Sequence, residues 1–410
     1  LVNNSNTAQK VDKGDNVEVV LLETPFYAEG GGQVGDSGEI RGPNGTVEIT
    51  ETKATIPDVI VHFGKVKKGS VSVGDTVETN VDRIRREDTA RNHTATHMLH
   101  AALRQVLGPH VRQAGSLVTA DRLRFDFSHI KAVTDDEMWK VQFLVNEKIR
   151  HNATIIRTEN TYVGAIEKGA LAFFGDKYGE TVRLVEIANG GRFSFEVCGG
   201  THVDRTGEVG SIYVLGESSI GAGMRRIEAV SGRAAERLVW NKFKSEAHIV
   251  KTLQTTPTEL GERVSGLLQQ LDNALKHING LEQKLSIVSA EALLPRVLEV
   301  EGVKVLAAET AASSSDLLRG TGDWLKDKLG TGVVVVGAIV NRNPMLVVMV
   351  TPDLIARGLN AANIARETAE VIGGGGGGRP GSAQAGGKYA DKLSEALALV
   401  PEIISQHIEK

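Results

Sequence analysis

The chain has 410 residues, of which 41% are hydrophobic but only 4% aromatic, so roughly two or three domains can form around Val, Leu, Ile and Ala. The formal net charge of −4 neither indicates nor excludes a nucleic-acid partner, and any RNA contact must come from local patches. No run of about 18 apolar residues occurs and no signal peptide opens the chain, so we expect no membrane partner. A single cysteine fits a reducing, cytoplasmic setting. The start at Leu1 rather than Met suggests a fragment or a processed product.

Short β-branched runs separated by turns fill residues 15–85. The runs are VEVVLLE, VHFGKV and VETNV, and the Gly-rich segment EGGGQVGDSGEI interrupts them. We expect a small β-barrel or a curled sheet here. Within the interruption, Gly30–Gly32 and Gln33 predict a tight turn that another backbone can approach closely.

A helix is predicted next, from about Thr89 to Leu107. Asp88 or Thr89 can cap its start, and the Gly-Pro pair that follows Leu107 stops it. The run HTATH places His93 and His97 four residues apart on this helix, so both imidazoles share one face. A strand (LRFDF), a helix at about 134–150 and further strands (ATIIRTENTY, TVRLVEI, RFSFEV, SIYVLGES) complete an α+β domain.

A second pair of potential ligands lies in the Gly-rich turn CGGTH, as Cys198 and His202. One thiolate and three imidazoles form a suitable tetrahedral set for Zn²⁺. The alternative is a buried structural thiol beside unrelated histidines. His100 is a rival ligand, although we expect it to support the site or to pack in the core.

The chemistry at such a zinc site stays open at this point. Four protein ligands would fill the tetrahedron, so one ligand is loose, or the metal becomes five-coordinate, or the zinc orients substrate without activating water. The H-E-x-x-H pattern of metalloproteases is absent, because position 94 is Thr, and the pattern of nucleobase deaminases is absent too.

Apolar residues recur at alternating spacings of three and four over residues 260–288, which predicts a long amphipathic helix of coiled-coil type. Its role is either that of a spacer or hairpin, or that of a dimerisation element. Residues 301–410 then form an α/β unit, with buried strands VKVLAAE, GVVVVGAIV and MLVVMV. We expect helices at 314–329, 361–371 and 388–404.

A run of six glycines precedes the last of these helices. Gly373, Gly374, Gly375, Gly376, Gly377 and Gly378 are followed by Arg379 and, further on, by Lys388. The run is either a flexible linker or a loop whose backbone N–H groups and neighbouring cations bind phosphate. We favour a phosphate or RNA contact.

These motifs together resemble the alanyl-tRNA synthetase family. The resemblance covers nearly the whole chain and rests on TPFYAEGGGQVGDSG, HTATH, RFDFSH, GALAFFGDKYGE, CGGTH, SIGAGMRRIEAVSG and GGGGGGRPGSAQAGGK. It implies the C-terminal half of such a synthetase, without the class II aminoacylation domain. The implied parts are a β-barrel subdomain (1–84), a zinc-binding editing domain (85–232), a helical linker or dimerisation segment (233–300) and a tRNA-binding α/β domain with a Gly-rich loop (301–410).

The resemblance also implies a function. The editing domain would hydrolyse seryl- or glycyl-tRNA(Ala), with Zn²⁺ on His93, His97, Cys198 and His202, and with Gln113 in the pocket. The C-terminal domain would bind tRNA(Ala) and, with the helical segment, form a homodimer; no DNA or membrane partner is implied. The alternatives are a freestanding trans-editing deacylase, a relative of DHH-type phosphoesterases, although no Asp-His-His motif occurs, or a non-catalytic tRNA-binding module.

Overall fold

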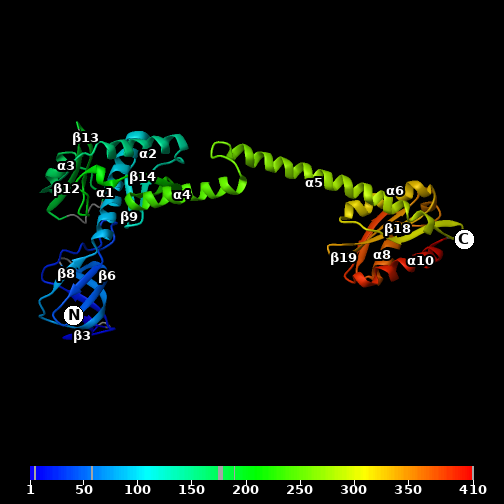
Figure 1. Cartoon of the computed structure of the whole chain (residues 1–410), viewed down its shortest axis with the longest axis horizontal. Helices are drawn as coiled ribbons and strands as arrows, with labels where there is room; N and C mark the ends of the chain where they lie inside the picture. The colour runs from blue at the N-terminus through cyan, green and yellow to red at the C-terminus, as the bar shows by residue number, and fades with distance from the viewer. Residues whose placement is uncertain (4–5, 57–58, 174–178, 189, 409–410) are drawn as a thin grey trace. The chain divides into compact units, whose positions relative to one another are not determined.

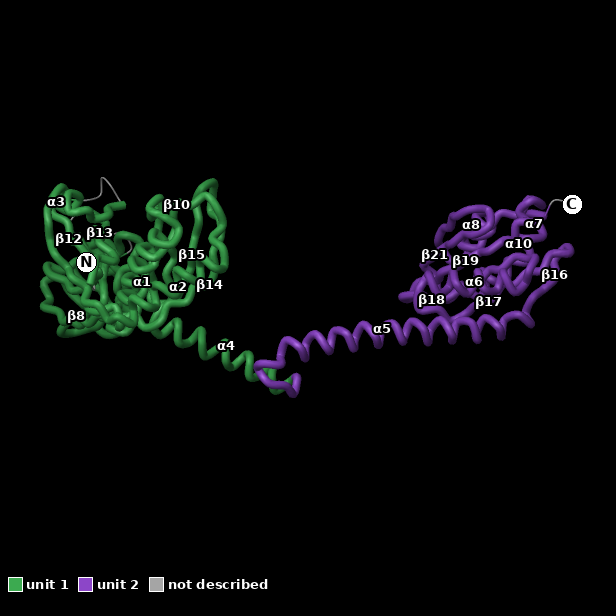
Figure 2. The backbone as a smooth tube through the Cα atoms, turned by 90° about the horizontal axis from the view of Figure 1, so that it is seen from above, with its two compact units in different colours: residues 1–252 green, residues 253–410 purple. Residues whose placement is uncertain are grey.

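The computed structural model divides the chain into two compact units, Leu1–Thr252 and Leu253–Lys410 (Figure 2). The structure describes residues 1–3, 6–56, 59–173, 179–188 and 190–408. Residues 174–178 of the GALAFFGDKYGE motif lie outside this described part. The predicted division into four parts remains a proposal, and the border between the units falls inside its helical segment.

An antiparallel sheet forms the first part of unit 1 (Figure 1). Its strands are β1 (Val2–Asn3), β2 (Asn6–Thr7), β3 (Lys10–Asp12), β4 (Asn16–Val20), β5 (Gly38–Arg41), β6 (Gly45–Ile56), β7 (Val59–Ser72) and β8 (Glu78–Val81). The order is β2-β1-β4-β7-β6-β5-β8, with β3 on β7, and no pair of described strands joins β8 back to β2. Of the two alternatives expected here, a small β-barrel or a curled sheet, the closed barrel is therefore not formed by the described strands. Register shifts bend the long β6–β7 pair, but they do not bring the two edges together.

The helix that carries HTATH is α1 (Arg83–Leu107), and it begins six residues earlier than predicted. Its N-cap is Asp82, whose side chain accepts a hydrogen bond from the backbone N–H of Arg85. The first turns are exposed or half-buried and carry no apolar stripe, so the hydrophobic pattern did not reveal them. From Thr89 onward most of the helix is buried, which makes α1 the centre of its domain.

The rest of unit 1 packs around α1. Helix α2 (Asp135–Arg150), which was predicted at about 134–150, packs against α1 and starts with a capping box at Thr134. Two antiparallel sheets, β14-β15-β10-β9 and β11-β12-β13, complete the α+β domain. Their strands are β9 (Gln113–Val118), β10 (Leu123–Ser128), β11 (Ile155–Thr161), β12 (Thr181–Ala188), β13 (Arg192–Val197), β14 (Ile212–Gly221) and β15 (Met224–Ser231); the short helix α3 (Tyr162–Glu167) follows β11.

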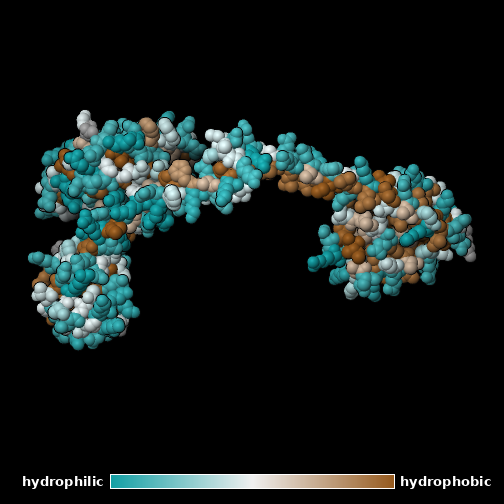
Figure 3. Space-filling model, in the orientation of Figure 1, coloured by the Kyte–Doolittle hydropathy of each residue, from teal (hydrophilic) through white to brown (hydrophobic). Residues whose placement is uncertain are grey.

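Two helices occupy the segment that was predicted to be helical and of coiled-coil type. Helix α4 (Gly232–Leu253) ends unit 1, and α5 (Leu260–Glu291) opens unit 2. Figure 3 shows hydrophobic residues along the surface of α5, and the side chains of Leu268, Leu271 and Leu285 are each more than half exposed. The helix itself is confirmed, while its pairing in a coiled coil stays a prediction. Within the described residues, no helix is both long enough and apolar enough to cross a membrane.

Unit 2 is a mixed sheet with helices on both faces, in the order β16-β17-β18-β19-β21-β20. The strands are β16 (Leu298–Val300), β17 (Val303–Glu309), β18 (Val333–Val340), β19 (Asn343–Val350), β20 (Gly375–Arg379) and β21 (Ser382–Gly386); the helices are α6 (Ser315–Leu329), α7 (Pro352–Ile355), α8 (Ala361–Val371), α9 (Leu393–Ala398) and α10 (Val400–His407). Along β18, Val333 and Val335 pack on the side of α8 and α10, whereas Val334 and Val336 pack on the side of α6. The helix predicted at 388–404 is broken, because a new helix starts with Pro401 in its first turn.

The glycine run was predicted to be a loop, and this prediction was wrong. Residues Gly375–Arg379 form the edge strand β20, which pairs with β21. A Cβ at Gly376 would lie 2.6 Å from the Cβ of Ala385 and 3.2 Å from the backbone of Ala365 in α8. Part of the run is therefore glycine because the helix and the neighbouring strand leave no room for a side chain.

The same strand offers a matched test of this packing. Gly376→Ala should lower the stability of unit 2 by about 1–3 kcal/mol, because the added methyl group overpacks the interface. Gly375→Ala should change it by less than about 0.5 kcal/mol, since no atom lies within 4 Å of the added Cβ. Thermal unfolding followed by calorimetry would compare the two, and equal midpoints would contradict the packing explanation.

Candidate metal centre and adjoining cavity

Four potential metal ligands converge inside unit 1. One donor atom each of His93, His97, Cys198 and His202 lies within 4.8 Å of the other three. The imidazoles come from one face of α1, as the spacing predicted, while the thiol and the last imidazole come from the turn after β13. A Cβ at Gly200 would lie 1.9 Å from the ring of His93, so this turn can approach α1 only with glycine at that position.

The distances within the cluster suit a tetrahedral ion. The Sγ of Cys198 lies 3.3 Å from Nε2 of His93 and 3.4 Å from Nε2 of His202. A thiolate and an imidazole nitrogen on one tetrahedral Zn²⁺ would lie about 3.6 Å apart, given the usual bond lengths. The residues present therefore fit the zinc site that the sequence predicted.

Each imidazole also has a polar neighbour at its other nitrogen. Nδ1 of His93 lies 2.6 Å from Oε1 of Gln33, Nδ1 of His97 lies 2.7 Å from a carboxylate oxygen of Glu196, and Nδ1 of His202 lies 3.1 Å from Oγ1 of Thr94. Since Oε1 of Gln33 can only accept, the Nδ1 of His93 must donate. This leaves Nε2 of His93 free for a metal.

The local electrostatics favours a thiolate at Cys198 and a neutral imidazole at His202, the forms that bind a metal. Burial raises the pKa of the Cys198 thiol, but the three nearby imidazoles outweigh burial and hold that pKa well below its usual value. Burial, together with the charge of His93, lowers the pKa of His202 to about 3. The pKa of His97 is raised instead, because Glu196 and Cys198 outweigh burial, so this imidazole must release a proton when a cation binds.

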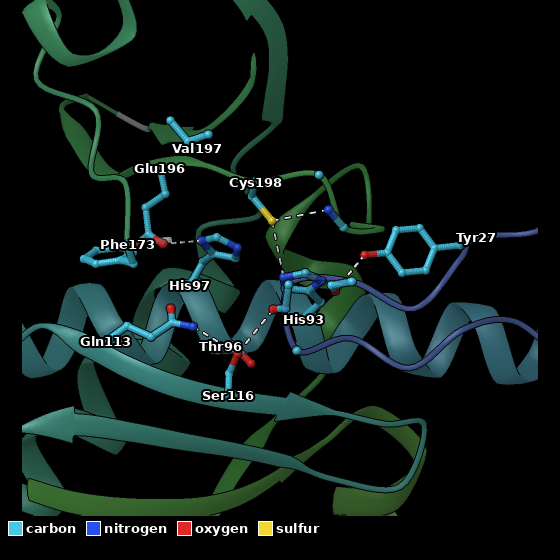
Figure 4. Close-up of a pocket in the computed structure, with 15 residues that line it drawn as sticks. Tyr27, His93, Thr96, His97, Gln113, Ser116, Phe173, Glu196, Val197 and Cys198 are labelled. Carbon is cyan, nitrogen blue, oxygen red and sulfur yellow. Dashed lines mark hydrogen bonds and ion pairs between the residues drawn. The ribbon is translucent and has the colours of Figure 1, made fainter. Parts of the chain in front are cut away.

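A cavity of about 380 Å³ opens beside the cluster (Figure 4). Its lining combines glycines with larger side chains that are mostly polar or aromatic: Tyr27, Gly30, Gly31, Gly32, His93, Thr96, His97, Gln113, Ser116, Phe173, Glu196, Val197, Cys198, Gly199 and Gly200. Gln113 thus lines the same cavity as His93, His97 and Cys198, and its Nε2 donates to Oγ of Ser116 over 2.9 Å. The glycine run at 373–378, Arg379 and Lys388 belong to the other unit.

Sequence reasoning missed several residues that hold the site together. Gln33 was assigned only to a tight turn, yet its side chain also bonds the backbone N–H and the hydroxyl of Thr201 in the CGGTH turn. The turn itself was predicted correctly, because a Cβ at Gly32 would lie 2.3 Å from Ser116. Arg183 bonds the carbonyl oxygens of Cys198 and Gly200. No spacing pattern links these residues to the ligands, since they are far away in the chain.

Three parts of the chain match known protein families, and nearly the whole chain matches known synthetases. Residues 1–85 match the family described as tRNA synthetases class II (A), residues 182–228 match the threonyl and alanyl tRNA synthetase second additional domain, and residues 302–406 match the DHHA1 domain. An alanine–tRNA ligase from Chloroflexus aurantiacus is 47% identical over 403 residues, which cover 96% of this chain and 45% of that protein. Another, from Dehalococcoides mccartyi, is 44% identical over 97% of this chain and 46% of its own length.

The chain belongs to the alanyl-tRNA synthetase family. It spans a little under half the length of these synthetase relatives. The match to the second additional domain includes Cys198 and His202, whereas His93 and His97 precede it. The solved C-Ala domain of Aquifex aeolicus alanyl-tRNA synthetase is 30% identical, with 27% of this chain and 97% of that chain covered and a TM-score of 0.24.

Proposed function

We propose that the chain hydrolyses the ester of tRNA(Ala) charged with serine or glycine, as the editing part of an alanyl-tRNA synthetase. The observation that carries the proposal is the cluster of three imidazoles and one thiol, of which His93, His97 and Cys198 line a cavity of about 380 Å³. Cavities of this size suit a small ligand such as an aminoacyl group. We infer that the aminoacyl group is attached to tRNA because the chain belongs to the synthetase family.

The need for such a site follows from the chemistry of alanine. A pocket for this small residue cannot strongly reject a close analogue by binding alone, so a second, hydrolytic site restores accuracy. A bound Zn²⁺ would supply a fixed positive charge beside the ester. The chain's own residues would orient the substrate: Gln113 and Ser116 line one wall of the cavity, and Gly30–Gly32 let the substrate approach the backbone.

A deacylation assay tests the proposal directly. Seryl-, glycyl- and alanyl-tRNA(Ala) would each be incubated with the purified chain, and the remaining ester would be counted over time. Fast loss of the seryl ester supports editing. Binding of tRNA without any ester loss would instead show a non-catalytic tRNA-binding module.

We further propose that residues 301–410 bind the tRNA through β20 and its neighbours. Arg379 and Lys388 are exposed, and β20 is an edge strand that pairs only with β21 among the described strands. Glycines without side chains let a phosphate backbone come close to this edge. The glycine run thus remains a proposed tRNA contact, although as a strand rather than a loop.

The expected effect of removing both cations is weaker tRNA binding with a smaller dependence on salt. Arg379→Ala combined with Lys388→Ala should lower the slope of log affinity against log salt by about one to two, because each phosphate contact releases about one counterion. The rate of ester cleavage at saturating tRNA should stay the same. Arg319→Ala, on α6 and also exposed, serves as the matched control. A slope unchanged by the double variant would argue against this surface.

The exposed apolar stripe of α5 supports a homodimer that forms through this helix. Sedimentation of the purified chain should then show a species of twice the chain mass. Leu271→Glu together with Leu275→Glu should convert it to a monomer, because charges would enter the helix–helix interface. A wild-type chain that sediments as a monomer at high concentration would contradict this proposal.

A further inference from the structure

Glu196 is a buried carboxylate that contacts two histidines of α1. It lies in β13, two residues before Cys198, and is only 2% exposed. One carboxylate oxygen lies 2.7 Å from Nδ1 of His97 (Figure 4). The other lies 2.8 Å from Nδ1 of His100. The carboxylate therefore bridges a predicted metal ligand and a histidine that is not part of the ligand cluster.

The surroundings of Glu196 explain why such a bridge is needed. Among the described residues its ion-pair partners are these two imidazoles, and the only other side chain that bonds the carboxylate there is Ser194, whose hydroxyl lies 3.4 Å away. An isolated buried carboxylate is costly, so its position depends on both imidazole donors. His100 itself is 1% exposed, and its ring contacts those of Phe125 and Phe173.

We propose that Glu196 is a positioning residue for the metal site, and that His100 holds Glu196 in place. By accepting the Nδ1–H of His97, the carboxylate selects one tautomer and ring orientation, in which Nε2 carries the lone pair and faces Cys198 and His202. His100 performs the same donation from one turn further along α1, but its Nε2 lies among aromatic rings. The inference rests on the proposed metal site and adds to it the pair that orients one ligand.

Variants at both positions can separate orientation from packing. Glu196→Ala should weaken zinc binding by about 10- to 100-fold, as is usual when the carboxylate behind a ligating imidazole is lost. Glu196→Gln should weaken zinc binding less than Glu196→Ala does. The amide oxygen can still accept from Nδ1 of His97, and the amide nitrogen can donate to Nδ1 of His100 if that ring takes its other tautomer. His100→Phe keeps the ring packing and removes the donor, so it should weaken binding. His100→Asn restores a donor near Nδ1 and should bind more tightly than His100→Phe.

Two measurements provide the readout without reference to catalysis. Competition with a chromophoric chelator gives the zinc affinity of the full chain, and the absorption spectrum of the Co²⁺-substituted protein reports the ligand geometry. A changed Co²⁺ spectrum in Glu196→Ala, with the thermal midpoint of the metal-free protein unchanged, would support the inference. If Glu196→Ala does not fold, Glu196→Gln and the two His100 variants decide the matter.

The inference and the proposed site can fail separately. A wild-type chain that binds no zinc would overturn both. Tight zinc binding by the wild type, with Glu196→Ala within about twofold of it, would overturn the role of Glu196 alone. Wild-type affinity in His100→Phe together with reduced affinity in His100→Asn would show that His100 acts by packing, which would also overturn the inference.

Discussion

Wild-type protein is expected to carry about one zinc ion per chain, and the double variant Cys198→Ala, His202→Ala should carry none after dialysis. Both residues lie in the turn after β13, so the variant removes the whole contribution of that turn and leaves only the two imidazoles of α1. The binding free energy of Zn²⁺ at structural sites in zinc-finger peptides is about 10–16 kcal/mol. Two histidines alone bind the ion too weakly to keep it during dialysis. Elemental analysis of the purified proteins measures the difference.

A matched control comes from another histidine pair of the same unit. His110 is exposed and His129 is half-buried, and Nε2 of His110 lies 2.9 Å from Nδ1 of His129, outside the cluster. Their double replacement by alanine removes two imidazoles as well, yet it should leave the zinc content unchanged. Full zinc occupancy in the Cys198, His202 variant would show that the metal site has been assigned to the wrong residues.

Seryl-tRNA(Ala) should be hydrolysed much faster than alanyl-tRNA(Ala), and Gln113→Ala should reduce this ratio or the rate while zinc stays bound. Serine and alanine differ by one hydroxyl group. A cavity that bonds this hydroxyl leaves its own polar group unpaired when alanine enters, at a cost of roughly 1–3 kcal/mol. That cost corresponds to about 5- to 150-fold discrimination, before any gain from better placement of the ester.

The position of Gln113 supports its part in this discrimination. Its side chain lines the cavity beside the ligands and is held by Ser116, so the amide can present a fixed polar group to the substrate. Gln105→Ala, an exposed glutamine of α1 outside the cavity, is the control and should behave like the wild type. Equal rates for both esters in the wild type would contradict editing. If both the ratio and the rate are unchanged in Gln113→Ala, this residue alone has no part in the pocket.

Local sequence patterns determined much of the architecture. Alternating three and four spacings predicted α5, continuous Val-rich runs predicted β17 to β19, and the helix expected at about 134–150 matches α2. The His93–His97 spacing on one helix face and the CGGTH turn predicted the four potential ligands that the structure brings together. These patterns succeed because each reflects the geometry of a single element, which neighbouring residues specify.

Tertiary structure alone decided the rest, because the deciding contacts join residues far apart in the chain. Gln33 reaches His93 from the connection between β4 and β5, and Glu196 reaches back to α1 from β13, so spacing in the sequence could not predict either contact. The open edge of the first sheet depends on where β2 and β8 end. Glycine has no side chain whose pattern could indicate a strand, so the sequence of the glycine run predicted a loop. Its pairing with β21 and its packing against α8 make residues 375–379 a strand.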